Sequence, residues 1–219
     1  MIKIENIDVY GFETAIRGMR NPMNSWGKSD SIKCFANPKC RSICKNNKSG
    51  LCIGENDLDL MKRLFKGGTE HRKYLRMINV TMDITCNHTW WAEFDTYKIG
   101  AVRNSCSKMH KIHVKEFVKD DFSWEGIKEC GGNTLATFEW VLGELERLRR
   151  LFNETHEKKY WRAIIELLPM GYNIRATVQM NYEVCVNIIR QREFHKVFEW
   201  CDFVKILLNL PYMKEIMGC

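Results

Sequence analysis

Alternation of apolar and polar residues predicts three strands. The clearest is the segment 78–86. Its apolar positions, which alternate with polar side chains, are Ile78, Val80, Met82, Ile84 and Cys86. A period of two places one face of such a segment against a core and the other toward water. Residues 3–10 alternate in the same way, and a β-type run at 172–180 follows the break at Pro169-Met170-Gly171.

Apolar residues spaced three and four apart predict the helices. A short helix is expected at 12–19 after Gly11, and another at 58–66, begun by Asn56 or Asp57 and ended by Gly67-Gly68. A long amphipathic helix is predicted from about residue 131 to Phe152, and a second at 157–168. Between strands and helices, the segment 102–108 is a polar stretch with small side chains that suits close approach to a phosphate or forms a solvated turn.

These elements predict an α+β fold, because long helices surround a few alternating strands. With 219 residues and 45% hydrophobic content, the chain can bury one sizeable core. We therefore expect a single domain over residues 1–219, interrupted by a cysteine-rich insert at about 31–54.

The segment after residue 180 reads as one long helix to Trp200, since it contains no Gly or Pro. At about 100° per residue, one sector of this helix is polar. It carries Asn181, Gln191, Arg192, His195 and Glu199, and the opposite side carries Val186, Ile189, Phe194, Val197 and Trp200. Buried polar groups need partners, so the polar sector is expected to face a ligand, another subunit or water.

The same segment resembles a known family. The positions that carry the resemblance are Leu168-Pro169, Asn181, Asn187, Arg192 and His195. In this order and spacing they are similar to the C-terminal motif of the flavin-dependent thymidylate synthases, the ThyX family. The resemblance implies that Asn181, Asn187 and His195 contact FAD, and that Arg192 lies against the dUMP base and activates it.

A second segment, FDTYKIGAVRNSCSK at 94–108, lies at the distance expected of the ThyX signature Arg-His-Arg-x-x-Ser-x-x-x-x-Ser-x-Arg. It departs from that signature, with Thr96-Tyr97-Lys98 in place of Arg-His-Arg and Lys108 in place of the last arginine. By resemblance, Tyr97 and Lys98 are what remains of the flavin and folate contacts. Ser105, Ser107 and Lys108 would take the dUMP phosphate.

The resemblance, which extends over roughly residues 57–208, is to a divergent ThyX-like protein of the kind carried by phages of Gram-positive bacteria. It implies a central twisted sheet flanked by long helices, a homotetramer, and sites at subunit interfaces. It also implies FAD-dependent methylation of dUMP, or of a related pyrimidine nucleotide, with a folate as the one-carbon donor. The altered Arg-His-Arg positions favour an alternative, a non-catalytic relative that binds or sequesters a nucleotide, because a lysine lacks the bidentate fork of an arginine.

The cysteine-rich insert suggests a third hypothesis. Its thiols are Cys34, Cys40, Cys44 and Cys52. Thiolates are good zinc ligands, so these four could hold a structural zinc in a zinc-stabilised interaction protein. The alternative is a polar loop of reduced thiols or adventitious disulfides.

Net charge and hydropathy limit the classes of ligand and partner that this chain is expected to bind. The net charge of +7 favours an anionic partner, but the basic residues are spread along the chain, which makes a nucleic-acid binder less expected than a protein for a small phosphorylated ligand. No apolar run reaches the roughly 18–20 residues of a membrane span, and the N-terminus lacks the pattern of a signal peptide. We expect a cytoplasmic protein, in the host cytoplasm if it is phage-encoded.

Overall fold

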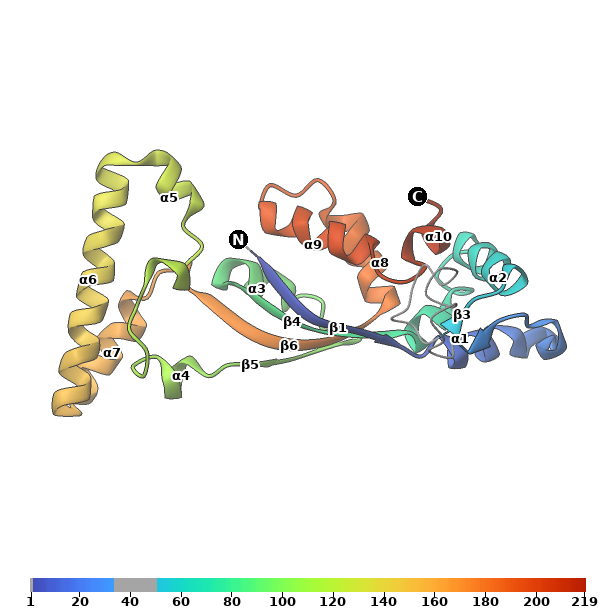
Figure 1. Cartoon of the computed structure of the whole chain (residues 1–219), viewed down its shortest axis with the longest axis horizontal. Coiled ribbons are helices and arrows are strands. Elements are labelled where there is room, and N and C mark those ends of the chain that lie inside the picture. Colours follow the sequence, from blue (N-terminus) through green and yellow to red (C-terminus); the bar gives the residue numbers. More distant parts are fainter. Residues whose placement is uncertain (1, 34–50) are drawn as a thin grey trace, which may run out of the picture. The chain divides into compact units, whose positions relative to one another are not determined.

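The computed structural model describes residues 2–33 and 51–219 and has an α+β fold, as the sequence predicts. Its main sheet has four antiparallel strands (Figure 1). In order across the sheet they are β1 (Lys3–Tyr10), β4 (Asn79–Asn87), β6 (Asn173–Asn181) and β5 (Ala101–Ser105). A second, antiparallel pair consists of β2 (Ile32–Lys33) and β3 (Leu51–Cys52).

The three strands predicted from alternation are confirmed as β1, β4 and β6. Strand β5 was not predicted, because the segment 102–108 was interpreted as a polar loop. Its pairing is decided by a distant partner: just beyond β5, the Cys106 backbone N–H donates to the Arg175 carbonyl at 2.9 Å.

The described residues form ten α-helices. They are α1 (Phe12–Arg20), α2 (Glu55–Lys66), α3 (His88–Phe94), α4 (Lys108–Lys111), α5 (Glu125–Cys130), α6 (Gly132–Thr155), α7 (Lys158–Leu167), α8 (Tyr182–Arg192), α9 (Phe198–Leu208) and α10 (Met213–Met217). The two long helices predicted at 131–152 and 157–168 are confirmed as α6 and α7. Among the helices of the described residues, none is long and apolar enough to cross a membrane.

The chain divides into two compact units. The first comprises residues 1–3, 84–96 and 104–176, and the second comprises residues 4–83, 97–103 and 177–219. Each of the four strands of the main sheet contributes residues to both units, so neither unit is a continuous stretch of chain. The prediction of a single domain stays a prediction.

The first unit has an aromatic and aliphatic core between α6 and α7, which run side by side (Figure 1). Leu145 and Ile164 are fully buried at the centre of this core. Phe122 meets Phe138 of α6 edge to face, with ring centroids 5.5 Å apart. Such packing explains the predicted pattern: the apolar stripes of the two helices cover each other.

A carboxylate on α6 joins that helix to the preceding loop. Glu146 accepts hydrogen bonds from Arg149 at 2.7 Å, from Arg150 at 3.0 Å and from the Phe117 backbone N–H at 3.4 Å. The hydrogen bonds from Arg149 outweigh the effect of burial and lower the pKa of Glu146 to about 2.

In the second unit, two buried ion pairs join residues that the structure describes. One joins α1 to α2: Arg20 Nε donates to Asp57 Oδ1 at 2.6 Å, and both side chains are buried. The residue types at this position predict Asn56 or Asp57 as the N-cap of α2. That prediction is wrong, because the helix begins at Glu55 after Gly54, and Asp30 accepts from the backbone N–H groups of Asn56 and Asp57 at 2.9 and 3.1 Å.

The other buried pair anchors α8. Arg72 donates to both carboxylate oxygens of Glu183, from Nη2 at 2.8 Å and from Nε at 3.1 and 3.2 Å. The side chains are 5% and 11% exposed. The ring of Phe65 contacts two guanidinium groups. The Cζ atom of Arg72 lies 5.4 Å from the ring centroid, and that of Arg190 lies 5.2 Å from it.

The predicted single helix from 181 to 200 is also wrong, since α8 ends at Arg192 and α9 begins at Phe198. The His195 backbone N–H bonds to the Arg192 carbonyl three residues back, which is a turn and not the i−4 bond of an α-helix. Phe194 is consequently 91% exposed, whereas the sequence analysis placed it on an apolar face.

The Arg72–Glu183 pair gives a stability prediction. Changing Glu183→Gln leaves the Arg72 guanidinium buried without a counter-charge, which we expect to lower the free energy of unfolding by about 3–5 kcal/mol. Urea denaturation at pH 7 measures the change. Glu193→Gln, an exposed neutralisation just beyond the same helix, is the matched control and should change stability by less than about 0.5 kcal/mol. Equal stabilities of the two variants would contradict the role assigned to the pair.

The depressed pKa of Glu146 predicts an acid dependence. A carboxylate whose folded pKa lies below its unfolded value stabilises the protein above the unfolded pKa, and this contribution is lost as pH falls through the folded pKa. We expect the Glu146 contribution to be lost between about pH 4.5 and pH 2, amounting to at most about 3 kcal/mol. In urea denaturation at several pH values, the free energy of unfolding of the Glu146→Gln variant should fall less than that of the wild type over this pH range. Glu154→Gln, exposed on the same helix, should follow the wild type.

Candidate functional site

A cluster of polar and aromatic side chains surrounds Arg192 in the last turn of α8. Arg192 Nε donates to Tyr97 Oη at 2.9 Å, and Tyr97 Oη donates to Gln191 Oε1, also at 2.9 Å. The guanidinium carbon lies 4.6 Å from the ring centroid of Trp200. We call Tyr97, Gln191, Arg192, His195 and Trp200 the Arg192 cluster. The chain itself therefore fixes the position of this guanidinium.

His195 completes the cluster. Its Nε2 lies 2.8 Å from Arg192 Nη1, and its Nδ1 lies 3.2 Å from the Val197 backbone nitrogen, which donates to it. These two contacts orient the imidazole beside the guanidinium.

Asn181 caps the start of α8. Its Oδ1 accepts from the Val184 backbone N–H at 3.1 Å, while its own backbone N–H donates to the Gly100 carbonyl at 3.2 Å. Gly100 has a φ of +84°, and a Cβ there would lie 2.5 Å from Asn181 Nδ2. A side chain at position 100 would therefore collide with the carboxamide, so a glycine is needed for Asn181 to lie in this position.

The other predicted flavin contacts lie in different settings. Asn187 is half-buried on α8. Within residues 2–33 and 51–219, neither its carboxamide nor Asn181 Nδ2 has a hydrogen-bond partner. Lys98 is exposed and forms no ion pair in the described part of the chain. Of the predicted cofactor residues, the structure thus joins Tyr97 and His195 to Arg192 and leaves two carboxamide groups open.

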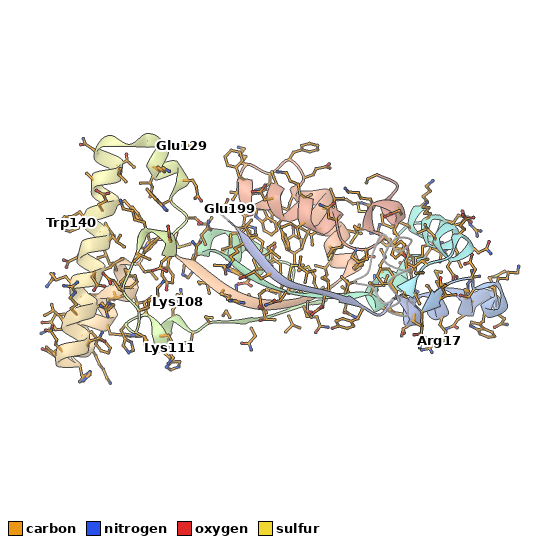
Figure 2. The ribbon with its side chains drawn as sticks, viewed as in Figure 1. Arg17, Lys108, Lys111, Glu129, Trp140 and Glu199 are labelled. Atoms are coloured by element: carbon orange, nitrogen blue, oxygen red, sulfur yellow. The ribbon has the colours of Figure 1, made fainter. Side chains whose placement is uncertain are left out.

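A separate hollow of about 250 Å³ lies in the first unit. Lys108, labelled in Figure 2, lines it together with Arg175, Cys106 and Tyr172, and the carboxylates of Asp120 and Asp121 line it as well. Lys108 Nζ lies 2.8 Å from His88 Nε2. Burial, and next the charge of Asp121, raise the pKa of the Tyr172 phenol above its usual value.

The predicted phosphate residues are only partly brought together here. Lys108 lines the hollow, but Ser105 and Ser107 do not. Ser107 is the N-cap of α4, where its Oγ accepts from the His110 backbone N–H at 3.3 Å. Ser105 is exposed at the end of β5.

Sequence reasoning missed two residues. Trp200 was placed on an apolar back, but it is fully buried under the Arg192 guanidinium. Arg175 was not singled out, although its cation lines the same hollow as Lys108. The sequence carries one signal for Arg175. It is a polar position of the predicted strand 172–180, and the alternation places its side chain on the face away from the core.

The predicted zinc site stays a prediction. Cys34, Cys40 and Cys44 lie outside the described residues. Cys52, at the end of β3, is disulfide-bonded, a state in which its sulfur is not a thiolate ligand. In the part of the chain that the structure describes, no group of three or more His, Cys, Asp or Glu side chains could hold a metal ion.

The Arg192 cluster yields a prediction for Tyr97. Tyr97→Phe keeps the ring against Arg192 and Trp200 but removes the hydroxyl that joins Arg192 to Gln191. We expect the free energy of unfolding to fall by about 1–2 kcal/mol in chemical denaturation, since a hydrogen bond to a charged group is lost. Tyr10→Phe, at a tyrosine that is 45% exposed on β1, is the control and should be near neutral. A Tyr97→Phe variant as stable as this control would show that the hydroxyl does not hold the guanidinium.

Comparison with known proteins places the fold. No family model and no curated protein matches the chain. Among solved structures, a crystal structure of thymidylate synthase X (ThyX) from Helicobacter pylori with FAD and dUMP is similar, with a TM-score of 0.67 and 16% identity over 99% of this chain and 97% of that one. Another H. pylori ThyX structure, also complexed with FAD and dUMP, has a TM-score of 0.66 and 16% identity over 98% of this chain and 97% of the other. The chain therefore has the ThyX fold over nearly its whole length.

Proposed function

We propose that this protein binds FAD and a pyrimidine nucleotide and catalyses FAD-dependent methylation of dUMP, or of a related nucleotide, with a folate as the one-carbon donor. One observation carries the proposal: a ThyX fold over 99% of the chain, in which α8 bears Arg192 held in place by Tyr97, His195 and Trp200. Fold alone does not imply function, so the argument depends on what these residues can do.

The residues beside α8 fit a flavin. An isoalloxazine ring presents carbonyl oxygens and ring nitrogens, and the donors of Asn181 Nδ2 and of the Asn187 carboxamide have no partner in the described part of the chain. The missing Cβ at Gly100 lets the Asn181 carboxamide lie close against the backbone at that position. A bound flavin would supply hydride transfer, and the chain's part is to bind and orient it.

Arg192 is suited to stabilising negative charge on a pyrimidine carbonyl. The guanidinium is delocalised and always charged, and its contacts with Tyr97 and Trp200 restrict its position before any ligand arrives. A positioned cation stabilises developing charge without reorganising at the moment of reaction. His195, whose Nε2 lies 2.8 Å from Nη1, contacts one edge of the guanidinium.

The hollow at Lys108 and Arg175, taken by itself within the first unit, suits a phosphate group. Two cations and two carboxylates line it, and Arg175 can offer paired donors to phosphate oxygens. The carboxylates of Asp120 and Asp121 would repel a phosphate placed beside them. A phosphate bound in this hollow would therefore lie on the Lys108 side.

Loss of catalysis with nucleotide binding retained is the second candidate, and one observation favours it. Where the family signature carries Arg-His-Arg, this chain has Thr96-Tyr97-Lys98, and the Tyr97 hydroxyl is already used by Arg192 and Gln191. That hydroxyl contributes to holding the cluster and is not open to a cofactor. Thr96 and Lys98 are exposed.

A homotetramer is part of the same proposal. Phe194 and Phe198 lie in and just after the turn that follows Arg192, and they are 91% and 81% exposed. Large apolar side chains so exposed beside a polar cluster are typical of a protein interface. A second copy of the chain that covers them would also exclude water from the neighbourhood of Arg192.

The proposal predicts nucleotide binding that depends on Arg192. The protein reconstituted with FAD should show the visible absorption bands of oxidised flavin and should bind dUMP in isothermal titration calorimetry. Arg192→Ala should weaken dUMP binding by about tenfold or more, because a charge-assisted contact is lost. Arg192→Lys, which retains the charge, should weaken it less.

The control is Arg63→Ala, which removes an exposed cation of the same unit from α2. It should bind dUMP like the wild type. A folded Arg192→Ala variant with unchanged dUMP affinity would overturn the assignment of this residue. Flavin and dUMP binding without formation of dTMP, when methylenetetrahydrofolate and a flavin reductant are supplied, would favour the non-catalytic candidate.

A further inference from the structure

A second pocket is lined by residues that are distant in sequence from the Arg192 cluster and from the Lys108 hollow. It encloses about 320 Å³ in the second unit, next to α1 and the loop that follows it. The residues that give it its chemical character are Ile16, Arg17, Arg20, Trp26, Lys33 and Leu51. We call it the α1 pocket. None of these residues belongs to the Arg192 cluster or to the Lys108 hollow.

The α1 pocket is cationic. Arg17, on α1 (Figure 2), is exposed and has no ion-pair partner in residues 2–33 and 51–219. Buried Arg20 uses Nε for Asp57 and Nη1 for the Ser25 carbonyl, and no described residue accepts from its Nη2. Lys33 pairs with Glu13 at 3.3 Å, but both side chains are more than 60% exposed, so this pair is weak. Among the described residues, these three cations are thus paired with two carboxylates, Glu13 and Asp57, and one positive charge remains in excess.

One wall of the pocket is aromatic and apolar. Trp26 is 51% exposed, and its Nε1 donates to Asn21 Oδ1 at 2.8 Å, which fixes the indole while leaving much of its surface uncovered. Buried Ile16 and Leu51 also line the pocket. A half-exposed indole beside the guanidinium of Arg17 and the Nη2 group of Arg20 offers a stacking surface and donors to the same ligand.

The floor of the α1 pocket is built before any ligand binds. Asp57 accepts five hydrogen bonds: one from Arg20 and four from the hydroxyl or backbone N–H groups of Ser29, Asp30 and Ser31. Burial would raise the pKa of Asp57, but the hydrogen bonds from Ser31, Ser29 and Arg20 outweigh it and hold the pKa below its usual value. Asp57 therefore stays ionised and keeps Ser29 and Ser31 at the pocket wall.

We propose that the α1 pocket binds a small ligand that joins a flat aromatic ring to an anionic group, either a phosphate or a carboxylate. The ring would lie against Trp26, and the anion would accept from Arg17 and from the open edge of Arg20. The volume is at the lower end of the range for small-molecule sites, roughly 300–1,000 Å³, which suits a ligand of one ring system. Preorganisation by Asp57 reduces the entropy lost when such a ligand binds.

Four probes separate the two parts of the ligand. Adenosine monophosphate joins a ring to a phosphate, and indole-3-acetate joins a ring to a carboxylate. Adenosine carries the ring alone, and inorganic phosphate carries the anion alone. In calorimetric titrations of the full chain, at least one of the first two should bind saturably, and adenosine and phosphate should each bind about tenfold more weakly or worse. The better of the two ring-anion probes identifies the anionic group.

Substitutions in the α1 pocket test whether the preferred probe binds there. Arg17→Gln and Trp26→Ala should each weaken the preferred probe by roughly tenfold, because one removes a cation and the other the stacking surface. Arg63→Gln, which removes an exposed cation from α2, should leave the affinity unchanged. Arg20 is left intact, since its partner Asp57 would otherwise be buried without a counter-charge.

Three results would overturn the proposal. One is the absence of saturable binding for both ring-anion probes. Another is equal affinity in Arg17→Gln, Trp26→Ala and the wild type. The third is loss of binding in Arg192→Ala together with retention in Arg17→Gln and Trp26→Ala, which would move the probe to the Arg192 cluster. Because Arg192→Ala is expected to retain α1-pocket binding, failure of this proposal and failure of the proposed function give different results.

Discussion

The buried pair of Arg72 and Glu183 is the interaction on which the candidate site depends most. Glu183 lies in the first turn of α8, and Arg72 holds it with three hydrogen bonds where water has little access. Neither charge is stable in that position without the other. Together they fix the start of the helix whose last turn carries Arg192. The pair thus connects the stability of the second unit to the position of its guanidinium.

Asp57 has a similar effect elsewhere in that unit. It lies inside α2 yet satisfies Arg20 on α1 and the backbone of the loop at residues 29–31. In both cases a buried carboxylate orders polar segments that no apolar contact would fix. The chain therefore uses its few buried charges where loops and helix ends, and not strand faces, have to be held.

The Arg192 cluster bears on the choice between a catalyst and a binding protein. Its guanidinium is held by side chains of the same chain, so its geometry does not wait for a ligand. Preorganisation of this kind serves either nucleotide binding or charge stabilisation during reaction. In the proposed function, Tyr97 stands at a position of the family signature. Its hydroxyl joins Arg192 to Gln191, so this residue stabilises the cluster.

The sequence by itself determined the elements whose signals are local. Alternation located β1, β4 and β6, and periodicity located α6 and α7. The sequence also singled out Arg192 and His195 as members of one polar sector, although the helix on which they were placed ends at Arg192. These features depend on residues less than about ten positions apart.

Tertiary structure decided the rest, because the partners lie far apart in the chain. Local sequence predicts Asp57 as a helix cap. In the structure its carboxylate instead accepts a hydrogen bond from Arg20, 37 residues earlier in the chain. Strand β5 forms where a partner strand about 70 residues later completes its hydrogen bonds, and Trp200 becomes part of the site only because the turn after α8 folds it back under Arg192. Local patterns record propensity and amphipathicity, whereas buried charges and strand pairing are satisfied only in three dimensions.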